Sequence, residues 1–141
     1  MTEWEKMLAG IPCDYRDRQL EERRLVAKKL FRAYNKTTDD DLEQRNAILQ
    51  QLLRNVGKDV YIEPDFICEF GSNITIGDHV FINFGCIIFD CGEVTIGDHT
   101  MFGPRAGIYT TNHALDPDER IQNVCISKPV TVGKRVWLGA D

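Results

Sequence analysis

The three histidines of the chain are its clearest candidates for acid–base chemistry. His113 lies in a polar segment, residues 109–114 (YTTNHA), which interrupts a regular pattern of apolar residues. An imidazole can accept a proton near neutral pH, and loops that leave a rigid scaffold often carry functional residues. His113 is therefore a candidate general base, although the residues alone also fit an ordinary exposed loop histidine.

The other two histidines fit a structural role better than a catalytic one. His79 and His99 each follow a Gly-Asp pair at equivalent places in a repeated sequence, so one repeated structural cause explains both. The three histidines form no HxxxxH pair, and the five cysteines include no CxxC spacing. The sequence therefore predicts no metal site, and the cysteines are expected to be reduced thiols that pack as small apolar side chains.

Charge and hydropathy limit the class of partner. The net charge is −5 and no long Lys/Arg run is present, which argues against nucleic acid or an anionic membrane surface. No stretch approaches the roughly 20 apolar residues of a membrane span, and the opening residues MTEWEKMLAG do not have the pattern of a signal peptide. We expect a cytoplasmic protein whose partner is a small molecule or another protein chain.

Residues 1–57 have the pattern of a helical segment. One stretch is rich in Arg, Lys and Glu with apolar residues near helical spacing, which is typical of a helix with one apolar face. Thr38 and the three aspartates after it predict the start of a further helix, which Gly57 is expected to end. The apolar faces predicted for the two helices are Leu20, Leu25, Leu30, Phe31 and Tyr34, and Ile48, Leu49, Leu52, Leu53 and Val56.

From Val60 onward the pattern changes to a period of six. Similar hexads occupy residues 74–79 (ITIGDH), 94–99 (VTIGDH) and 130–135 (VTVGKR). A period of six fits neither an α-helix nor the alternation of a half-buried strand. It is typical of a coil with flat sides, in which each short strand buries one aliphatic residue and glycine, which tolerates unusual backbone angles, makes the corner. Three hexads would close one triangular turn, and residues 58–141 would form this coil with a protruding loop near 110–128.

The order of motifs resembles a known family over essentially the whole chain. The hexads resemble those of the hexapeptide-repeat transferases, and the other motifs resemble the maltose and galactoside O-acetyltransferase group. The resemblance implies a mainly β fold, a left-handed parallel β-helix after an α-helical N-terminal segment, assembled as a homotrimer. It also implies transfer of an acetyl group from acetyl-CoA to a sugar hydroxyl of the maltose, glucose or galactoside type. The motifs concerned are residues 7–10 (MLAG), 61–64 (YIEP), 70–74 (FGSNI), 83–84 (NF), His113 and 128–139 (KPVTVGKRVWLG).

The resemblance also assigns roles on the acetyl side of the reaction. At the position of His113 the family has its catalytic base, in a loop that reaches toward a neighbouring subunit. The backbone N–H of Ala140 matches the donor to the oxyanion. Trp137 matches a position beside the pantetheine arm of CoA, although packing between coils or subunits is an alternative role for this side chain.

Four residues match positions that contact the acceptor sugar. Asn83 carries an amide that can donate and accept at once, although a structural asparagine inside the coil is an alternative. Glu69 and Asp90 match acidic or polar positions, and Asp14 is a looser match. The chain departs from the family in having Glu69 where Asp is more frequent and Phe81 where Tyr is frequent, and both changes would alter which sugar fits.

The sequence ends in the middle of a hexad, at residues 138–141 (LGAD). Because members of the resembled group continue for several coils, a shortened chain is expected, and a noncatalytic trimeric binding or assembly module on the same scaffold is the alternative to an enzyme. A metal-dependent carbonic anhydrase on a similar coil is disfavoured by the missing HxxxxH pair and the helical opening. Acyl acceptors other than sugars stay open, because the fold does not fix the substrate.

Overall fold

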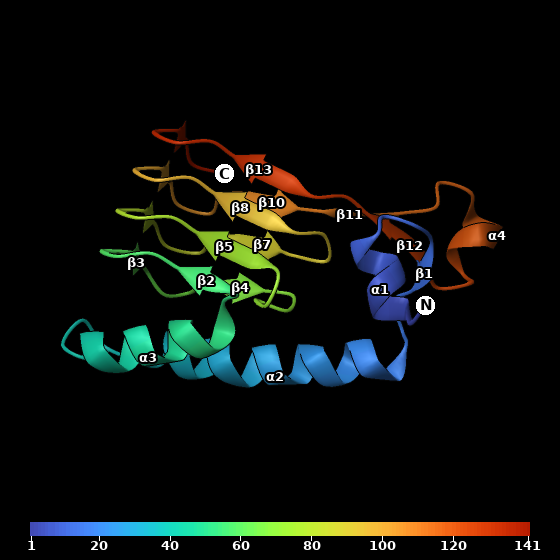
Figure 1. Ribbon diagram of the computed structural model, residues 1–141, viewed down its shortest axis with the longest axis horizontal. Coiled ribbons are helices and arrows are strands. Elements are labelled where there is room, and N and C mark those ends of the chain that lie inside the picture. The colour runs from blue at the N-terminus through green and yellow to red at the C-terminus, as the bar shows by residue number, and fades with distance from the viewer.

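The computed structural model describes residues 1–141 and has three parts: an N-terminal helical segment, a coil of short strands, and a small sheet beside the coil (Figure 1). The helices of the first part are α1 (Glu3–Leu8), α2 (Arg18–Asn35) and α3 (Leu42–Leu52). The strands of the coil are β2 (Asn55–Val56), β3 (Tyr61–Ile62), β4 (Ile67–Cys68), β5 (Ile74–Ile76), β6 (Phe81–Ile82), β7 (Ile87–Phe89), β8 (Val94–Ile96), β9 (Met101–Phe102), β10 (Gly107–Tyr109), β13 (Val130–Val132) and β14 (Trp137–Leu138). The side sheet contains β1 (Cys13–Asp14), β11 (Thr111–His113) and β12 (Val124–Ser127), with the short helix α4 (Pro117–Arg120) in its loop.

The coil has three flat faces, each a parallel sheet whose strands come from successive turns. The sheet orders are β13-β8-β5-β2, β14-β9-β6-β3 and β10-β7-β4. Most strands send an aliphatic side chain inward, while β4 buries Cys68 and β9 buries Phe102. Ile76, Ile82 and Ile88 of one turn are at most 1% exposed. A single strand of two or three residues could not be stable alone, so the stacking of turns over this shared apolar core holds the coil together.

Each turn of the coil is longer than three hexads. Tyr61 pairs with Phe81 and Phe81 with Met101, so equivalent positions lie 20 residues apart. The prediction that three hexads close one turn was therefore wrong by two residues. The inward residues Ile76, Ile82 and Ile88 keep the spacing of six, but Ile96, which pairs with Ile76 in the next turn, lies eight positions after Ile88. The additional residues lie at the corner that follows β4 and β7.

Two of the hexad glycines, Gly77 and Gly97, are needed for close approach between turns, and none of the three has an unusual backbone angle. Positive φ falls on the residue two places after each hexad glycine, at His79 (57°), His99 (60°) and Arg135 (56°). A Cβ added at Gly77 would lie 2.2 Å from Asp98 Oδ1, and one at Gly97 would lie 2.6 Å from the carbonyl carbon of Gly133. The prediction that these glycines are present because they tolerate unusual backbone angles was therefore wrong.

The same corners account for two histidines. The rings of His79 and His99 stack with centroids 4.8 Å apart, and Nδ1 of His79 lies 2.9 Å from an oxygen of Asp59 in the preceding turn. At these corners Asp78 Oδ1 accepts a hydrogen bond from the Lys58 N–H, as does Asp98 Oδ1 from the Asp78 N–H. The repeat therefore places these residues in a ladder along one edge of the coil.

Two predicted features of the helices are wrong in detail. Leu25 is 53% exposed, because the buried face of α2 is formed by Leu20, Ala27, Phe31 and Tyr34. Thr38 does not cap a helix: its N–H and hydroxyl donate to the Asp41 carboxylate, and α3 starts after Asp41.

Helix α3 ends at Leu52, and the chain then enters the first turn of the coil through β2. Val56 is therefore a strand residue and Gly57 does not end the helix, which differs from the prediction. Ile48, Leu49, Leu52 and Leu53 are buried as expected.

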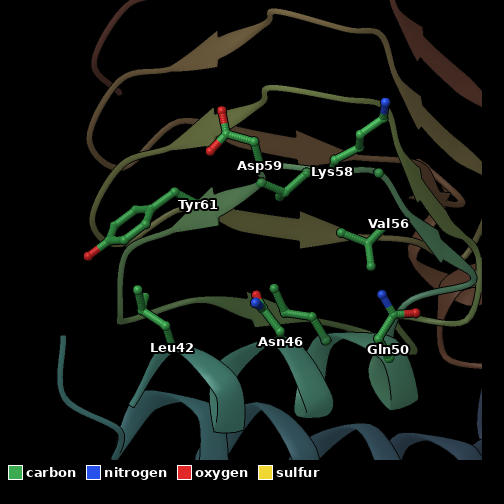
Figure 2. A pocket seen from close by; sticks show the side chains of 10 residues that line it. Leu42, Asn46, Gln50, Val56, Lys58, Asp59 and Tyr61 are labelled. Atoms are coloured by element: carbon green, nitrogen blue, oxygen red, sulfur yellow. The ribbon is translucent and has the colours of Figure 1, made fainter. Parts of the chain in front are cut away.

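Helices α2 and α3 cover the first turn of the coil, where an open end would expose its core (Figure 1). The Tyr34 hydroxyl donates to the Ile62 carbonyl (2.6 Å), and the buried Arg45 guanidinium donates to Thr37 Oγ1 (2.8 Å). A cavity of about 300 Å³ lies between α3 and the first turn, lined in part by Leu42, Asn46 and Lys58 (Figure 2). None of the helices combines the length and apolar character needed to cross a membrane.

Candidate active site

The candidate site lies at the wide corner of the coil, where three stacked strands end at one edge. Glu69 follows β4, Asp90 follows β7 and Thr110 follows β10, and these strands are neighbours in one parallel sheet. The buried Thr110 hydroxyl donates to the Phe89 carbonyl (2.6 Å) and accepts from the Gly92 N–H (2.9 Å). After Thr110 the chain leaves the coil. The hydrogen bonds of Thr110 to Phe89 and Gly92 of the preceding turn therefore fix where the loop begins.

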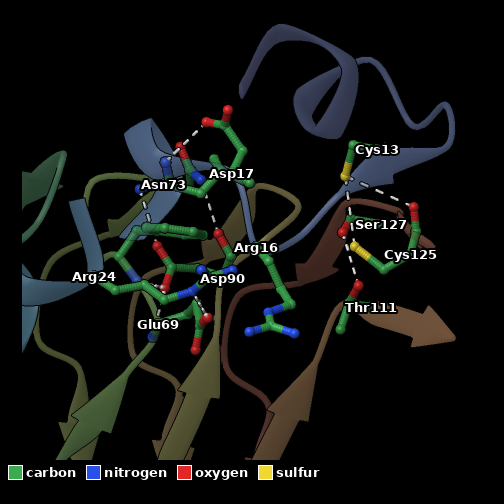
Figure 3. A network of polar contacts seen from close by, with 12 residues as sticks. Cys13, Arg16, Asp17, Arg24, Glu69, Asn73, Asp90, Thr111, Cys125 and Ser127 are labelled. Atoms are coloured by element: carbon green, nitrogen blue, oxygen red, sulfur yellow. Dashed lines mark hydrogen bonds and ion pairs between the residues drawn. The ribbon is translucent and has the colours of Figure 1, made fainter. Parts of the chain in front are cut away.

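Asp90 holds this corner together. Its side chain is fully buried, and its carboxylate accepts hydrogen bonds from the N–H groups of Glu69 (3.1 Å), Phe70 (2.8 Å) and Asn73 (3.1 Å) (Figure 3). Burial raises the pKa of the Asp90 carboxyl, and the backbone donors oppose this shift. With no exposed surface, Asp90 is placed to shape the segment that carries Glu69 and not to reach a sugar in solution.

Glu69 forms an ion pair that links the coil to helix α2. Its carboxylate accepts from the Arg24 guanidinium, and both side chains are about four-fifths buried (Figure 3). The Arg24 guanidinium also lies over the Phe70 ring, 5.4 Å from its centroid. The pair therefore has a fixed geometry, which leaves the remaining carboxylate and guanidinium atoms as oriented hydrogen-bonding groups.

His113 lies on β11, the outer strand of the antiparallel sheet β1-β12-β11. Cys13 is opposite Cys125, and Cys125 is opposite His113, so the N-terminal strand β1 and the histidine share one sheet. The imidazole is exposed and contacts the Tyr15 ring edge-on, with centroids 5.1 Å apart and an interplanar angle of 76°. The N-terminal segment thus helps to position a residue nearly 100 positions away.

A cavity of about 130 Å³ brings His113 and Glu69 together. A second, more open cavity of about 400 Å³ continues from it along α2, and the two share Tyr15, Arg24 and Glu69. The floor of the first is apolar, and burial raises the pKa of the Cys91 thiol to about 12, so this thiol stays protonated. The lining of the first cavity is Met7, Tyr15, Arg24, Glu69, Phe89, Cys91, Thr111, His113 and Cys125.

Asp14 precedes the residues that line these cavities. It is exposed; its N–H donates to Glu3 Oε2 (2.7 Å) and its carboxylate accepts from the Arg16 N–H (2.9 Å). The first contact ties β1 to helix α1, and the second fixes the turn between β1 and α2. Asp14 lies next to the site through its neighbour Tyr15 and does not line either cavity.

Three further residues that the sequence singled out lie on another part of the coil. Asn83 precedes β7 whereas Asp90 follows it, so the two residues lie at opposite ends of that strand. Trp137 is on β14, in the same sheet as β6, and is 75% exposed. Ala140 comes close to Gly103, where an added Cβ would lie 2.7 Å from the Ala140 nitrogen. The chain therefore carries two separate groups of candidate residues.

Arg24 and Tyr15 were missed by sequence reasoning, although both line the cavity beside His113. Arg24 lies in the run RQLEERRL, where nothing separates it from solvated helix cations. All five cysteines are buried and free, as expected, and no group of three or more potential metal ligands is close enough to hold an ion.

Comparison with known proteins identifies the family. The model of the maltose acetyltransferase hexapeptide capping motif matches residues 6–57. Nodulation protein L from Rhizobium meliloti (strain 1021) is 41% identical over 98% of the chain and 75% of its own length. The crystal structure of a maltose O-acetyltransferase from Clostridium difficile 630 superposes with a TM-score of 0.96 and 40% identity, over 99% of this chain and 74% of that one.

The chain belongs to the maltose/galactoside O-acetyltransferase group of the hexapeptide-repeat acyltransferases. A galactoside acetyltransferase solved in complex with coenzyme A, 31% identical, superposes with a TM-score of 0.93 over 99% of the chain and 70% of its own length. The family, the mainly β fold with a left-handed β-helix after helices, and the assignment as an acetyl-CoA-dependent sugar O-acetyltransferase are thereby confirmed.

Proposed function

We propose that the chain transfers the acetyl group of acetyl-CoA to a saccharide hydroxyl, with His113 as the general base. The observation that carries this proposal is the cavity in which the exposed imidazole faces the fixed Glu69–Arg24 pair. A carboxylate and a guanidinium offer an acceptor and several donors, which is what a polyhydroxylated ligand requires. The apolar floor lets the imidazole act beside a partly dehydrated substrate.

The acetyl group passes directly from the sulfur of CoA to the sugar oxygen. Acetyl-CoA supplies an acetyl thioester that an alcohol can attack. A ring nitrogen of His113 takes the proton of the sugar hydroxyl as the new oxygen–carbon bond forms and the carbon–sulfur bond breaks, and then gives that proton to the departing sulfur. The Glu69–Arg24 pair orients the sugar, and Asp90 keeps Glu69 in place through the backbone.

The second group of candidate residues fits the thioester substrate. The Ala140 N–H donates no hydrogen bond within the chain, so it is free to stabilise the negative charge that develops on the carbonyl oxygen. The exposed Trp137 indole offers an apolar surface on the sheet that contains β6, the strand just before Asn83, and this surface is suited to an extended pantetheine arm. Asn83 would bind the acceptor through its amide.

We also propose a homotrimer, in which the site forms between subunits. The two groups of residues lie on different parts of one chain, so a neighbouring copy is needed to bring Asn83 and His113 together. Phe84 (56%), Met101 (50%) and Trp137 (75%) are exposed, and apolar surface of this kind is typical of interfaces. Acetyl-CoA use together with five reduced thiols supports a cytoplasmic location.

Release of CoA from acetyl-CoA tests the function, with maltose, glucose and a galactoside as acceptors. His113→Ala should lower acceptor-dependent turnover by about 10²–10⁴-fold, the usual contribution of a positioned base. His79→Ala is the matched control, because this histidine lies in the edge ladder outside the cavity, and should retain wild-type turnover. Sedimentation of the same samples should give the mass of three chains.

Other results would contradict specific parts of the proposal. Equal turnover in wild type and His113→Ala would refute the role of the base. Absence of acceptor-dependent CoA release in every sample would favour the noncatalytic binding module. A monomeric mass would remove the shared site.

A further inference from the structure

Tyr15 is the side chain through which the N-terminal segment touches the candidate base. It follows β1, and its backbone N–H donates to the Asn123 carbonyl (3.1 Å), next to the start of β12. Because residues two apart on a strand share a face, and paired residues face the same side, Tyr15 lies on the same side of the sheet as Cys13, Cys125 and His113. Its ring therefore reaches across β12 toward the imidazole.

The imidazole has no other fixed partner in the chain. No hydrogen bond from a side chain or backbone group of the chain holds either ring nitrogen, and the packing contact that orients the ring is the edge-on contact with Tyr15 at 5.1 Å. An exposed histidine on an outer strand would otherwise sample several staggered rotamers. Rotamers that turn the ring away from the cavity would also turn its nitrogens away from Glu69.

Tyr15 is itself held more firmly than the histidine. It is partly buried and packs against the small apolar cluster of Met7, Cys13, Leu20, Phe70, Cys91 and Cys125. The Tyr15 hydroxyl makes no hydrogen bond within the chain, so the ring and not the phenol oxygen makes the contact with His113. The cluster thus holds the Tyr15 ring in place, and the ring can in turn fix the orientation of the imidazole.

We propose that Tyr15 is a positioning residue, whose ring holds the His113 imidazole in the orientation needed to take the proton from the acceptor hydroxyl. The inference rests on the proposed function, because it presumes that His113 is the base. Loss of the ring would leave the imidazole in place but free to turn. The cost would then fall on the chemical step, because a misplaced base lowers the rate without preventing binding.

The test compares Tyr15→Leu and Tyr15→Phe with the wild-type chain in the CoA-release assay. Tyr15→Leu should lower kcat by about 10–100-fold and change the KM for acetyl-CoA by less than about threefold. Tyr15→Phe keeps the ring and should recover most of the lost kcat. A merely structural effect of the leucine would lower the amount of folded protein and would not separate kcat from KM.

A spectroscopic measurement follows the imidazole directly. The chain has three histidines, so the His113 ring protons can be assigned by their absence from His113→Ala spectra. The Tyr15 ring current should displace these resonances in the wild type and in Tyr15→Phe, and the displacement should disappear in Tyr15→Leu. The ring signals of His79 and His99 should stay unchanged in all samples.

The outcomes separate this inference from the proposed function. If His113→Ala abolishes turnover but Tyr15→Leu keeps kcat within about twofold of wild type, or leaves the His113 resonances unmoved, the positioning role is refuted and the base remains. If Tyr15→Phe loses as much activity as Tyr15→Leu, the hydroxyl and not the ring is responsible, which also refutes it. If His113→Ala is fully active, the proposed function itself fails.

Discussion

Replacing Gly97 by alanine tests the explanation given for the corners of the coil, and Gly133→Ala is its matched control. Both glycines occupy the same place in the hexad, and neither has positive φ, so alanine is compatible with the backbone at both. The surroundings differ. A Cβ at Gly97 would lie 2.6 Å from the carbonyl carbon of Gly133 and 2.7 Å from the Lys134 nitrogen, whereas one at Gly133 would meet only Val136 Cγ2 at 3.9 Å.

The magnitude follows from what must move. The atoms that a Cβ at Gly97 would meet belong to backbone, so two turns would have to separate by most of an ångström. Overpacking of this kind costs about 1–3 kcal/mol. The separation also strains the bonds from Gly97 N–H to the Val132 carbonyl and from Arg135 N–H to the Asp98 carbonyl, both 2.9 Å, at about 1 kcal/mol each. Gly97→Ala should therefore destabilise by about 2–5 kcal/mol, while Gly133→Ala should be neutral or stabilise by up to about 1 kcal/mol.

Thermal unfolding of the two variants and the wild type at one protein concentration gives the comparison, because assembly makes the midpoint concentration-dependent. At about 3 °C per kcal/mol for a chain of this size, Gly97→Ala should melt roughly 6–15 °C below wild type. Gly133→Ala should melt within about 3 °C of wild type. Equal effects of the two substitutions would refute the close-approach argument. They would show that glycine is required at this place of the hexad for a reason common to both positions and not because of the neighbouring turn.

Three further predictions concern the site and the edge ladder. Asp90→Asn should lower the free energy of unfolding by about 2–4 kcal/mol and raise the acceptor KM, because an amide N–H₂ would face one of the three backbone donors. Urea unfolding measures the first effect and the CoA-release assay the second. Unchanged stability would contradict the account of the corner. The hydrogen bond from the Asp78 N–H holds the pKa of Asp98 below its usual value of 3.8. The stability contributed by this carboxylate is therefore present above pH 3.8 and is lost as the pH falls through the lower folded-state pKa. Unfolding at a series of pH values should show the stability of Asp98→Asn converging with that of wild type in acid, and a stability difference that does not change with pH would refute this. Burial raises the pKa of Cys13 and Cys91 to about 12, so a disulfide reagent should label the thiols only after unfolding, and rapid stoichiometric labelling of native protein would contradict the packing described.

The coil was predictable from sequence because its signal is local and repeated. Each strand needs one apolar residue at a fixed place, so Ile76, Ile82 and Ile88 reveal the faces without knowledge of contacts. The turn length was not predictable in the same way, since the spacing of six continues through Ile88 to the buried Val94, and the two additional residues appear only because Ile96, and not Val94, pairs with Ile76. The helix boundaries failed for a related reason: Asp41 competes with the helix for the hydrogen bonds of Thr38, and such competition depends on the folded backbone.

The same irregular corner explains why the site could be predicted only in part. At the regular Gly-Asp corners each turn packs closely against the next, which leaves little room for a site there. Where the corner widens, Asp90 must bind three backbone donors to hold it, and the next turn leaves the coil there as the loop that carries His113. His113 and Glu69, which line one cavity, were proposed from the sequence because they match family positions, whereas Arg24 and Tyr15 come from the N-terminal segment and approach the corner only after that segment has packed against the loop. Departures from a repeat are therefore the places to search for function in a chain of this kind. The spacing of the repeat cannot predict which side chains from outside the repeat, such as Arg24 and Tyr15, pack there.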